Sequence, residues 1–120
     1  YNFVEGVALL IANGIDPTVA FSDGQYPLHM IVNASNKENF ELLRILLEAG
    51  AGINVKNRNG ETPLHLAIQS GMENKTMIDA LIDKGAALKA KTNNGDQPLD
   101  YALEKSLKSY LKKVIKNRNS

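Results

Sequence analysis

The chain has 120 residues, and its 14 basic side chains almost balance its 13 acidic ones, which leaves a net charge of +1. This length is typical of one small domain, and the near-neutral charge gives no overall attraction to nucleic acid or to an anionic membrane. The chain has no cysteine and no apolar run near the ~18 residues of a membrane span, so we expect no disulfides, no thiolate chemistry and no membrane span.

The first predicted element is an amphipathic helix over 3–12 that ends at Gly14. It matches only the second half of the units described below, so we interpret 1–20 as an incomplete unit and expect the chain to be part of a longer protein. Its apolar residues Phe3, Val7 and Leu10 leave open a weaker alternative, which is self-association through that face.

A Gly-x-x-Pro-Leu motif occurs three times, at 24–28, 60–64 and 95–99, so that its copies are 36 and 35 residues apart. Repeats of this length are typical of stacked arrays, in which each unit buries its apolar face against its neighbours. Each glycine follows Asp or Asn, and such pairs favour tight turns because both residues tolerate a positive φ. We therefore predict three projecting, hairpin-like loops, called fingers below.

The first full unit is predicted over 21–56, with two helices after its finger. Helices are expected over 27–34 and 39–49, and Gly50 ends the second one. The apolar face of that second helix contains Phe40, Leu43, Ile45, Leu46 and Leu47.

The second unit, 57–91, repeats this order. Thr62 is the predicted N-cap and Pro63 the first residue of a helix that Gly71 ends, and Gly85 closes the second helix. The apolar side of the second helix contains Met77, Ile78, Leu81 and Ile82.

The third unit, 92–120, combines a predicted helix over 98–105 with a final amphipathic helix. The apolar stripe of that last helix contains Leu107, Tyr110, Leu111, Val114 and Ile115. Basic residues alternate with it, at Lys105, Lys108, Lys112, Lys113, Lys116 and Arg118. They indicate either the solvated outer side of a capping unit or, as an alternative, a site for phosphate or an acidic partner.

The segment Thr62-Pro63-Leu64-His65-Leu66-Ala67 resembles the Thr-Pro-Leu-His-x-Ala motif of the ankyrin repeat family, and 26–29 and 97–100 match it in part. The resemblance implies an all-α ankyrin-repeat solenoid of stacked helix-turn-helix units joined by hairpin-like loops. It implies one domain over 1–120, with a partial N-terminal repeat at 1–20, repeats at 21–56 and 57–91, and a C-terminal capping repeat at 92–120. The units exceed the family's period of about 33 residues, and the insertions at 35–39 and 71–75 are expected to lengthen a loop on one flank.

His29 and His65 occupy equivalent places in successive units, and the resemblance implies rings that hydrogen-bond to a neighbouring loop backbone. No His-Glu-x-x-His or Cys-His spacing indicates a metal, no glycine-rich loop indicates a nucleotide, and the acidic residues form no catalytic pair. We therefore predict no catalytic, metal or cofactor site, and we do not expect an enzyme.

The resemblance implies a partner-binding surface on the fingers and the exposed ends of the first helices. The predicted binding residues are Ser22, Asp23, Gln25, Tyr26, Asn33, Lys56, Arg58, Asn59, Glu61, Gln69, Ser70, Lys91, Asn93, Asn94, Asp96 and Glu104. Tyr26 and Arg58 are the expected hot spots because Tyr and Arg are enriched there; alternatively, Tyr26 fills the family's Thr position and packs on the neighbouring loop. Lys56 and Lys91 occupy matching places about 10 Å apart and predict a short positive stripe.

These observations predict a protein–protein interaction module that binds a protein or peptide on its concave side, as a monomer in the cytoplasm or nucleus, or in the host cytosol for a pathogen's protein. No nucleic-acid partner is expected. The alternative is a targeting or substrate-recruiting arm of a larger enzyme or host-directed effector.

Overall fold

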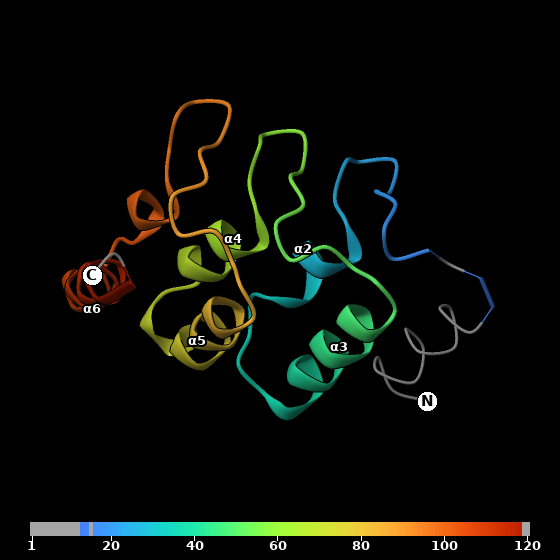
Figure 1. Cartoon of the computed structure of the whole chain (residues 1–120), viewed down its shortest axis with the longest axis horizontal. Helices are drawn as coiled ribbons and strands as arrows, with labels where there is room; N and C mark the ends of the chain where they lie inside the picture. The colour runs from blue at the N-terminus through green and yellow to red at the C-terminus, as the bar shows by residue number, and fades with distance from the viewer. Residues whose placement is uncertain (1–12, 15, 119–120) are drawn as a thin grey trace.

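The computed structural model describes residues 13–14 and 16–118, and this part of the chain contains helices and turns but no strand. Three fingers project from one side, and the helices lie below them in pairs that follow one another along the long axis (Figure 1). The principal extents are 42 × 29 × 25 Å. The predicted all-α fold is confirmed, while the helix predicted over 3–12 lies outside the described residues.

The helices of the first two units begin where local chemistry favours a start. In α4 (Pro63–Gln69), the Thr62 hydroxyl accepts a hydrogen bond from the backbone N–H of His65 at 3.4 Å, and Pro63 is the first helical residue. In α2 (Pro27–Ile31), proline again takes the first position. After α4, Gly71 has a φ of +90°, which ends the helix as predicted.

The second helices are α3 (Lys37–Glu48), α5 (Lys75–Asp83) and α6 (Lys105–Arg118). The predicted start of α3 at 39 is wrong by two residues, because the Asn36 side chain caps the helix by accepting from the Asn39 N–H at 2.8 Å. Before α5, 71–75 is not an open loop, since it contains the short 3-10 helix η1 (Met72–Asn74).

The first helices of the outer units are shorter than predicted. α2 ends at Ile31 instead of 34, and the helix predicted over 98–105 is only the 3-10 turn η2 (Pro98–Tyr101). The turn ends because Ala102 has an extended backbone, with φ −78° and ψ 116°, and Lys105 already belongs to α6. Ala102 is fully buried, as is Ala67 at the equivalent place in α4.

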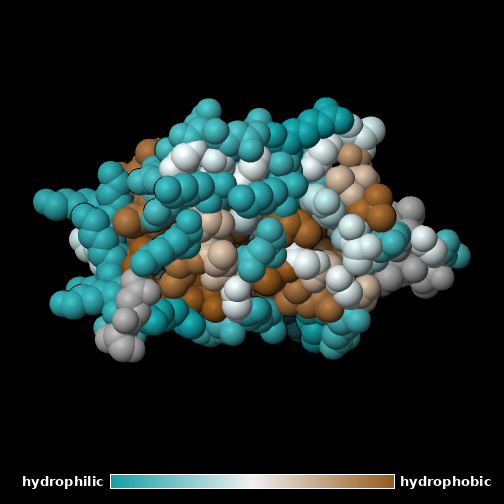
Figure 2. All heavy atoms as spheres, turned by 45° about the horizontal axis from the view of Figure 1, so that its top comes forward, coloured by the Kyte–Doolittle hydropathy of each residue, from teal (hydrophilic) through white to brown (hydrophobic). Residues whose placement is uncertain are grey.

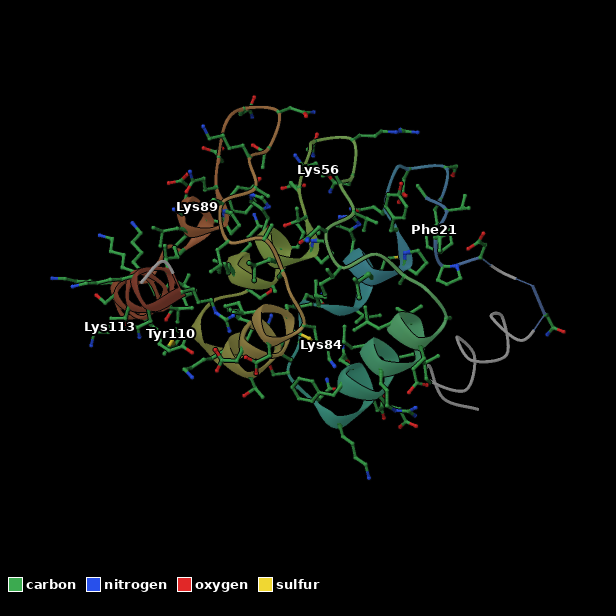
Figure 3. The ribbon with its side chains drawn as sticks, in the orientation of Figure 1. Phe21, Lys56, Lys84, Lys89, Tyr110 and Lys113 are labelled. Atoms are coloured by element: carbon green, nitrogen blue, oxygen red, sulfur yellow. The ribbon has the colours of Figure 1, made fainter. Side chains whose placement is uncertain are left out.

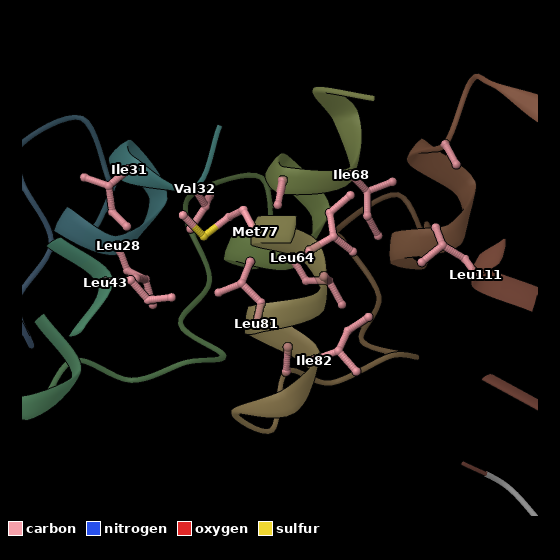
Figure 4. Packing of buried hydrophobic residues seen from close by; sticks show 14 of the residues in the cluster. Leu28, Ile31, Val32, Leu43, Leu64, Ile68, Met77, Leu81, Ile82 and Leu111 are labelled. Atoms are coloured by element: carbon pink, nitrogen blue, oxygen red, sulfur yellow. The ribbon is translucent and has the colours of Figure 1, made fainter. Parts of the chain in front are cut away.

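One continuous core runs through the helix pairs, and Figure 4 shows Met77 between Val32 of the first unit and Leu64 of the second. Leu28, Leu64, Ala67 and Ala102 are buried as expected, whereas Leu99 is only half-buried. The largest fully buried side chains are Leu28, Ile31, Leu42, Leu43, Leu46, Leu64, Ile68, Met77, Ile78, Leu81, Leu107 and Leu111. The units are therefore joined by shared burial, as a stacked array requires.

A polar cluster joins α6 to α5. The Tyr110 hydroxyl donates to the Asp79 carboxylate, which also accepts from the Lys75 ammonium group at 2.8 Å. The same ammonium lies 4.3 Å from the centre of the Tyr110 ring. Figure 3 shows Tyr110 between the two helices and Lys113 on the outer side of α6.

In the described part of the chain, no helix has the length and apolar character needed to cross a membrane.

Candidate binding surface

The three fingertips, 21–25, 57–61 and 92–96, share one backbone geometry. In each, the first residue donates its N–H to the carbonyl of the fifth, at 2.8 to 3.0 Å, and the glycine donates to the carbonyl of the first at 2.9 Å. The glycines have φ values of +85°, +78° and +85°, a region that residues with a Cβ avoid. The predicted turns are thus confirmed, and each tip presents its side chains on an equivalent framework.

Neighbouring fingertips are tied to each other at one repeated position. The Arg58 guanidinium donates to the carbonyl of Ser22, and the Asn93 amide donates to the carbonyl of Arg58 at 2.7 Å. A backbone hydrogen bond of 2.9 Å also joins the Asn93 N–H to the carbonyl of Asn59. These bonds fix the spacing between fingers, so Arg58 and Asn93 serve the scaffold while remaining exposed.

Lys56 and Lys91 lie side by side at the bases of the second and third fingers. The Lys56 ammonium group donates to the carbonyl of Lys91 at 3.1 Å, and both side chains are exposed. Figure 3 shows Lys56 on the second finger and Lys89 near the base of the third. The contact brings the Lys56 ammonium group to the backbone of Lys91, while the positive stripe itself stays a prediction.

Both histidines are used inside the array. His29 Nδ1 accepts from the Tyr26 N–H at 3.1 Å, so the proton is on Nε2, which donates to the carbonyl of Glu61 in the next finger at 2.8 Å. His65 repeats this with the Thr62 N–H at 3.1 Å and the carbonyl of Asp96 at 2.9 Å. Burial lowers the pKa of the His29 imidazole, against hydrogen bonding and charge at Glu61 that favour protonation. The predicted structural role of both rings is confirmed.

Glu61 is partly buried and belongs to a hydrogen-bond network. Its carboxylate accepts from the Tyr101 hydroxyl at 2.7 Å and from the amides of Asn57 and Asn59 at 2.9 and 3.4 Å. Burial opposes ionisation, but these hydrogen bonds together outweigh it and lower the pKa of the Glu61 carboxyl. Burial and Glu61 also raise the pKa of Tyr101 to about 12. Glu61 is thus committed to the fold more than to a partner.

Tyr26 stands at the N-cap position that Thr62 occupies in the next unit, and its ring is half-buried beside His29 at 5.9 Å between centroids. This arrangement matches the alternative in which Tyr26 fills the Thr position. Its remaining exposed edge is still available for contact.

The first-helix ends provide a second group of exposed polar residues. Asn33, Gln69 and Ser70 are exposed, whereas the Glu104 carboxylate accepts from the Met72 N–H at 2.8 Å and so joins the third unit to the second. A shallow polar hollow lies between the inner ends of the first two units, and its lining is Asn33, Ala34, Ser35, Ser70, Glu73 and Asn74.

Most predicted binding residues are exposed, and the structure separates them by what their side chains do. Gln25, Tyr26, Glu61 and Asp96 are half-buried. Of the exposed ones, six have side chains with no hydrogen-bond or ionic partner among the described residues: Ser22, Asn33, Gln69, Ser70, Lys91 and Asn94. Figure 2 shows hydrophilic side chains along the fingers and apolar ones in the middle of the face below them.

Two interior amides escaped the sequence analysis. Asn74, which is 2% exposed, donates to the carbonyls of Val32 and Ala67 at 2.7 and 3.0 Å, and accepts from the Ser35 hydroxyl at 2.8 Å. Asn39, at the equivalent place one unit earlier, donates to the carbonyl of Ile31 at 2.8 Å. The available signal was their separation of 35 residues, which equals that of Gly50 and Gly85 after the second helices of the same two units.

Among residues 13–14 and 16–118, no three His, Asp or Glu side chains are grouped so that they could hold a metal ion. The surface offers hydrogen bonds and scattered charge, which are the means of recognising another macromolecule.

Comparison with known proteins agrees with this geometry. A family model for ankyrin repeats in three copies matches residues 1–74 and 28–119. E3 ubiquitin-protein ligase KEG of Arabidopsis thaliana is 37% identical over 67 residues, which are 56% of this chain and 4% of that protein. Ankyrin repeat domain-containing protein 53 of Mus musculus is 44% identical over 50 residues, or 41% of this chain and 10% of the relative. Ankyrin repeat and SOCS box protein 16 of Homo sapiens is 37% identical over 68 residues, or 56% and 14%.

The chain therefore spans a small fraction of the length of these relatives. The family match, by contrast, extends over nearly all of the chain, and it coincides with the finger, first helix and second helix that recur in the structure. This chain belongs to the ankyrin repeat family, whose repeats are generally protein–protein interaction modules.

Proposed function

We propose that the chain is a non-catalytic module that binds a protein or peptide along the side formed by the fingers and the exposed ends of the first helices. The observation that carries this proposal is that Gln69, Lys91 and Asn94 are exposed and that their side chains have no hydrogen-bond or ionic partner among the described residues. The backbone beneath them is held by hydrogen bonds between fingers.

A surface that is ordered before binding loses little conformational entropy when a partner docks. The interlocked fingertips supply that order, because Arg58 and Asn93 fix each tip relative to the next. Specificity would then come from the free polar groups, and the cationic Lys56 and Lys91 would favour partners with acidic side chains at this place.

Selection of a phage-displayed peptide library against the chain tests this proposal. Selected peptides are titrated against the Gln69→Ala/Lys91→Ala/Asn94→Ala variant and against a Lys37→Ala/Lys84→Ala control, whose exposed lysines lie on α3 and just after α5. We expect the first variant to weaken binding by about tenfold or more and the control to leave it unchanged. Peptides sensitive only to the control would refute the location.

A second candidate is a recruiting arm of a larger protein. It is favoured by the small share of each relative that this chain covers, and one of those relatives is named an E3 ubiquitin-protein ligase. The recruiting role uses the same surface, so mass spectrometry of the intact gene product distinguishes the two candidates. An attached catalytic domain supports the arm, and repeats alone exclude it.

A further inference from the structure

The outer side of α6 carries an unbalanced positive charge. This helix of 14 residues contains six basic side chains and no acidic one. Since the whole chain has a net charge of only +1, the remaining residues carry a net charge of −5. The charge is therefore concentrated at the end of the array that lies opposite α2 and α3 (Figure 1).

Four of these residues form one line, which we call the lysine row: Lys105, Lys108, Lys112 and Lys116. At 3.6 residues per turn, they fall within about 80° of the helix circumference. All four are exposed, and Leu107 and Leu111 on the opposite side are buried in the core.

The lysine row is not neutralised by the protein. Within the described residues, none of the four lysines forms an ion pair with a carboxylate. The only ion pair of α6 there is that of Arg118 with Asp83, at 3.4 Å. The exposed side of α3 differs, because Arg44 there lies between Glu41 and Glu48, at 3.7 and 3.1 Å.

This arrangement works against the stability of the helix. Like charges three or four residues apart destabilise a helix, and lysines in the first turn face the positive end of the helix dipole. Only Lys116, in the last turn, is favoured by the dipole. Solubility of an end unit requires only a polar surface, which mixed charges also provide. For Lys105, Lys108 and Lys112 the local rules are broken without such a gain, which is typical of residues with a functional role.

We propose that the lysine row binds an extended acidic segment of a partner protein. Lysines four residues apart on a helix are about 6 Å apart along its axis. Side chains on one face of an extended strand are separated by about 6.7 Å, twice the rise per residue. A segment with Asp or Glu at alternate positions therefore places successive carboxylates opposite successive lysines.

Two other polyanions fit this surface less well. Proteins that bind nucleic acid favour the bidentate guanidinium of arginine for phosphate and, for single-stranded nucleic acid, exposed aromatic rings. On α6, the guanidinium of Arg118 is paired with Asp83, and the Tyr110 ring is half-buried against Lys75. A helix that lies on a membrane inserts its apolar face, and the apolar face of α6 is packed in the core.

A labelled peptide of alternating Glu and Thr, titrated by fluorescence anisotropy at about 0.15 M salt, tests the proposal. We expect the Lys108→Gln/Lys112→Gln variant to bind it about three- to tenfold more weakly than the unchanged protein. The Lys37→Gln/Lys84→Gln control removes the same charge elsewhere and should bind within about twofold. Loss of like charges should also raise the urea midpoint of the row variant, so weaker binding would not reflect unfolding.

Several outcomes would overturn the proposal. Equal weakening of both variants would mean that only net charge matters, and equal binding of a Gln–Thr peptide would mean that the carboxylates are not recognised. Tighter binding to a single-stranded oligonucleotide of the same charge, or to phosphatidylserine vesicles, would assign the row to nucleic acid or to a membrane surface. The finger-directed peptides of the preceding section should be unaffected by the row variant, which keeps the two proposals separable.

Discussion

Replacement of Asn74 by alanine should destabilise the array more than any exposed substitution. The Asn74 amide joins two units, because it donates both to the Val32 carbonyl at the end of the first unit's helix and to the Ala67 carbonyl of its own. In the Asn74→Ala variant, the Val32 carbonyl loses the only hydrogen bond that it accepts among the described contacts. Water cannot easily replace this bond, because Asn74 is only 2% exposed. Ala67 keeps the N–H of Ser70 at 3.3 Å.

The magnitude follows from these partners. A buried carbonyl left without a donor costs about 1–3 kcal/mol, and loss of the second hydrogen bond adds about 1 kcal/mol. We therefore expect Asn74→Ala to lower the free energy of unfolding by about 2–4 kcal/mol. Asn39→Ala is the matched control, because Asn39 makes one such bond from a half-buried position that water can replace, and it should cost about 1 kcal/mol.

Urea unfolding, followed by circular dichroism, measures both variants, with unchanged m-values expected. Asn74→Asp separates hydrogen bonding from packing: the carboxylate keeps the shape but faces two carbonyls, so it should cost more than alanine at pH 7. Burial raises the pKa of such an acid above its unfolded value, so its penalty should shrink as the pH falls and the acid becomes a donor. Equal costs for Asn74→Ala and Asn39→Ala, or an aspartate milder than alanine, would refute the reasoning.

Three other predictions concern the fingers, the histidines and α6. Gly60→Ala should lower the free energy of unfolding by roughly 2–4 kcal/mol, because a Cβ at this φ of +78° lies 2.7 Å from the backbone of the neighbouring finger. Gly95→Ala meets nothing within 4 Å, so it should lower the free energy of unfolding by only about 1 kcal/mol, for its backbone conformation. Similar urea midpoints for the two variants would contradict this. Because the folded-state pKa of His29 lies below its ordinary 6.5, the unfolded chain binds more protons, so stability is full above pH 6.5 and declines as the pH falls below it; a His29→Gln variant should lose this component in thermal scans at pH 7 and 5. Tyr110→Phe removes the hydrogen bond to Asp79 and keeps the ring, so it should cost about 1 kcal/mol by calorimetry, and no change would mean that the bond only replaces water.

Local chemistry explains why the helix starts of the repeat could be predicted from the sequence. A proline at the first helical position, a threonine cap and a glycine at positive φ act on their own neighbours, so α4 appears where Thr62, Pro63 and Gly71 place it. The helix predicted over 98–105 failed for the opposite reason. Its residues have acceptable propensity, but the backbone becomes extended at Ala102, although the equally buried Ala67 is helical at the same place in the second unit, so no local signal marks the break.

The contacts between units were harder to predict because they join residues far apart in the sequence. The Asn74 amide meets a carbonyl 42 residues earlier, and no local pattern tells which carbonyl ends up within reach. Arg58 is similar: its type and exposure indicated a hot spot, whereas its guanidinium is directed at the Ser22 carbonyl. The exposure of the fingers follows from the repeat, but the division of their residues between scaffold and surface does not.

Asp100 shows how the third unit differs from the two before it. It occupies the place of His29 and His65, and its carboxylate accepts from the Gln97 N–H at 2.8 Å, as the histidine Nδ1 atoms do. A carboxylate has no proton to donate, so this position cannot supply the hydrogen bond that Nε2 makes to the next finger. Leu103 is 84% exposed at the place where Val32 and Ile68 are buried. The carboxylate of Asp100 thus removes one hydrogen bond to a further unit, whereas Leu103 is as apolar as Val32 and Ile68 and is exposed because no described residue covers it.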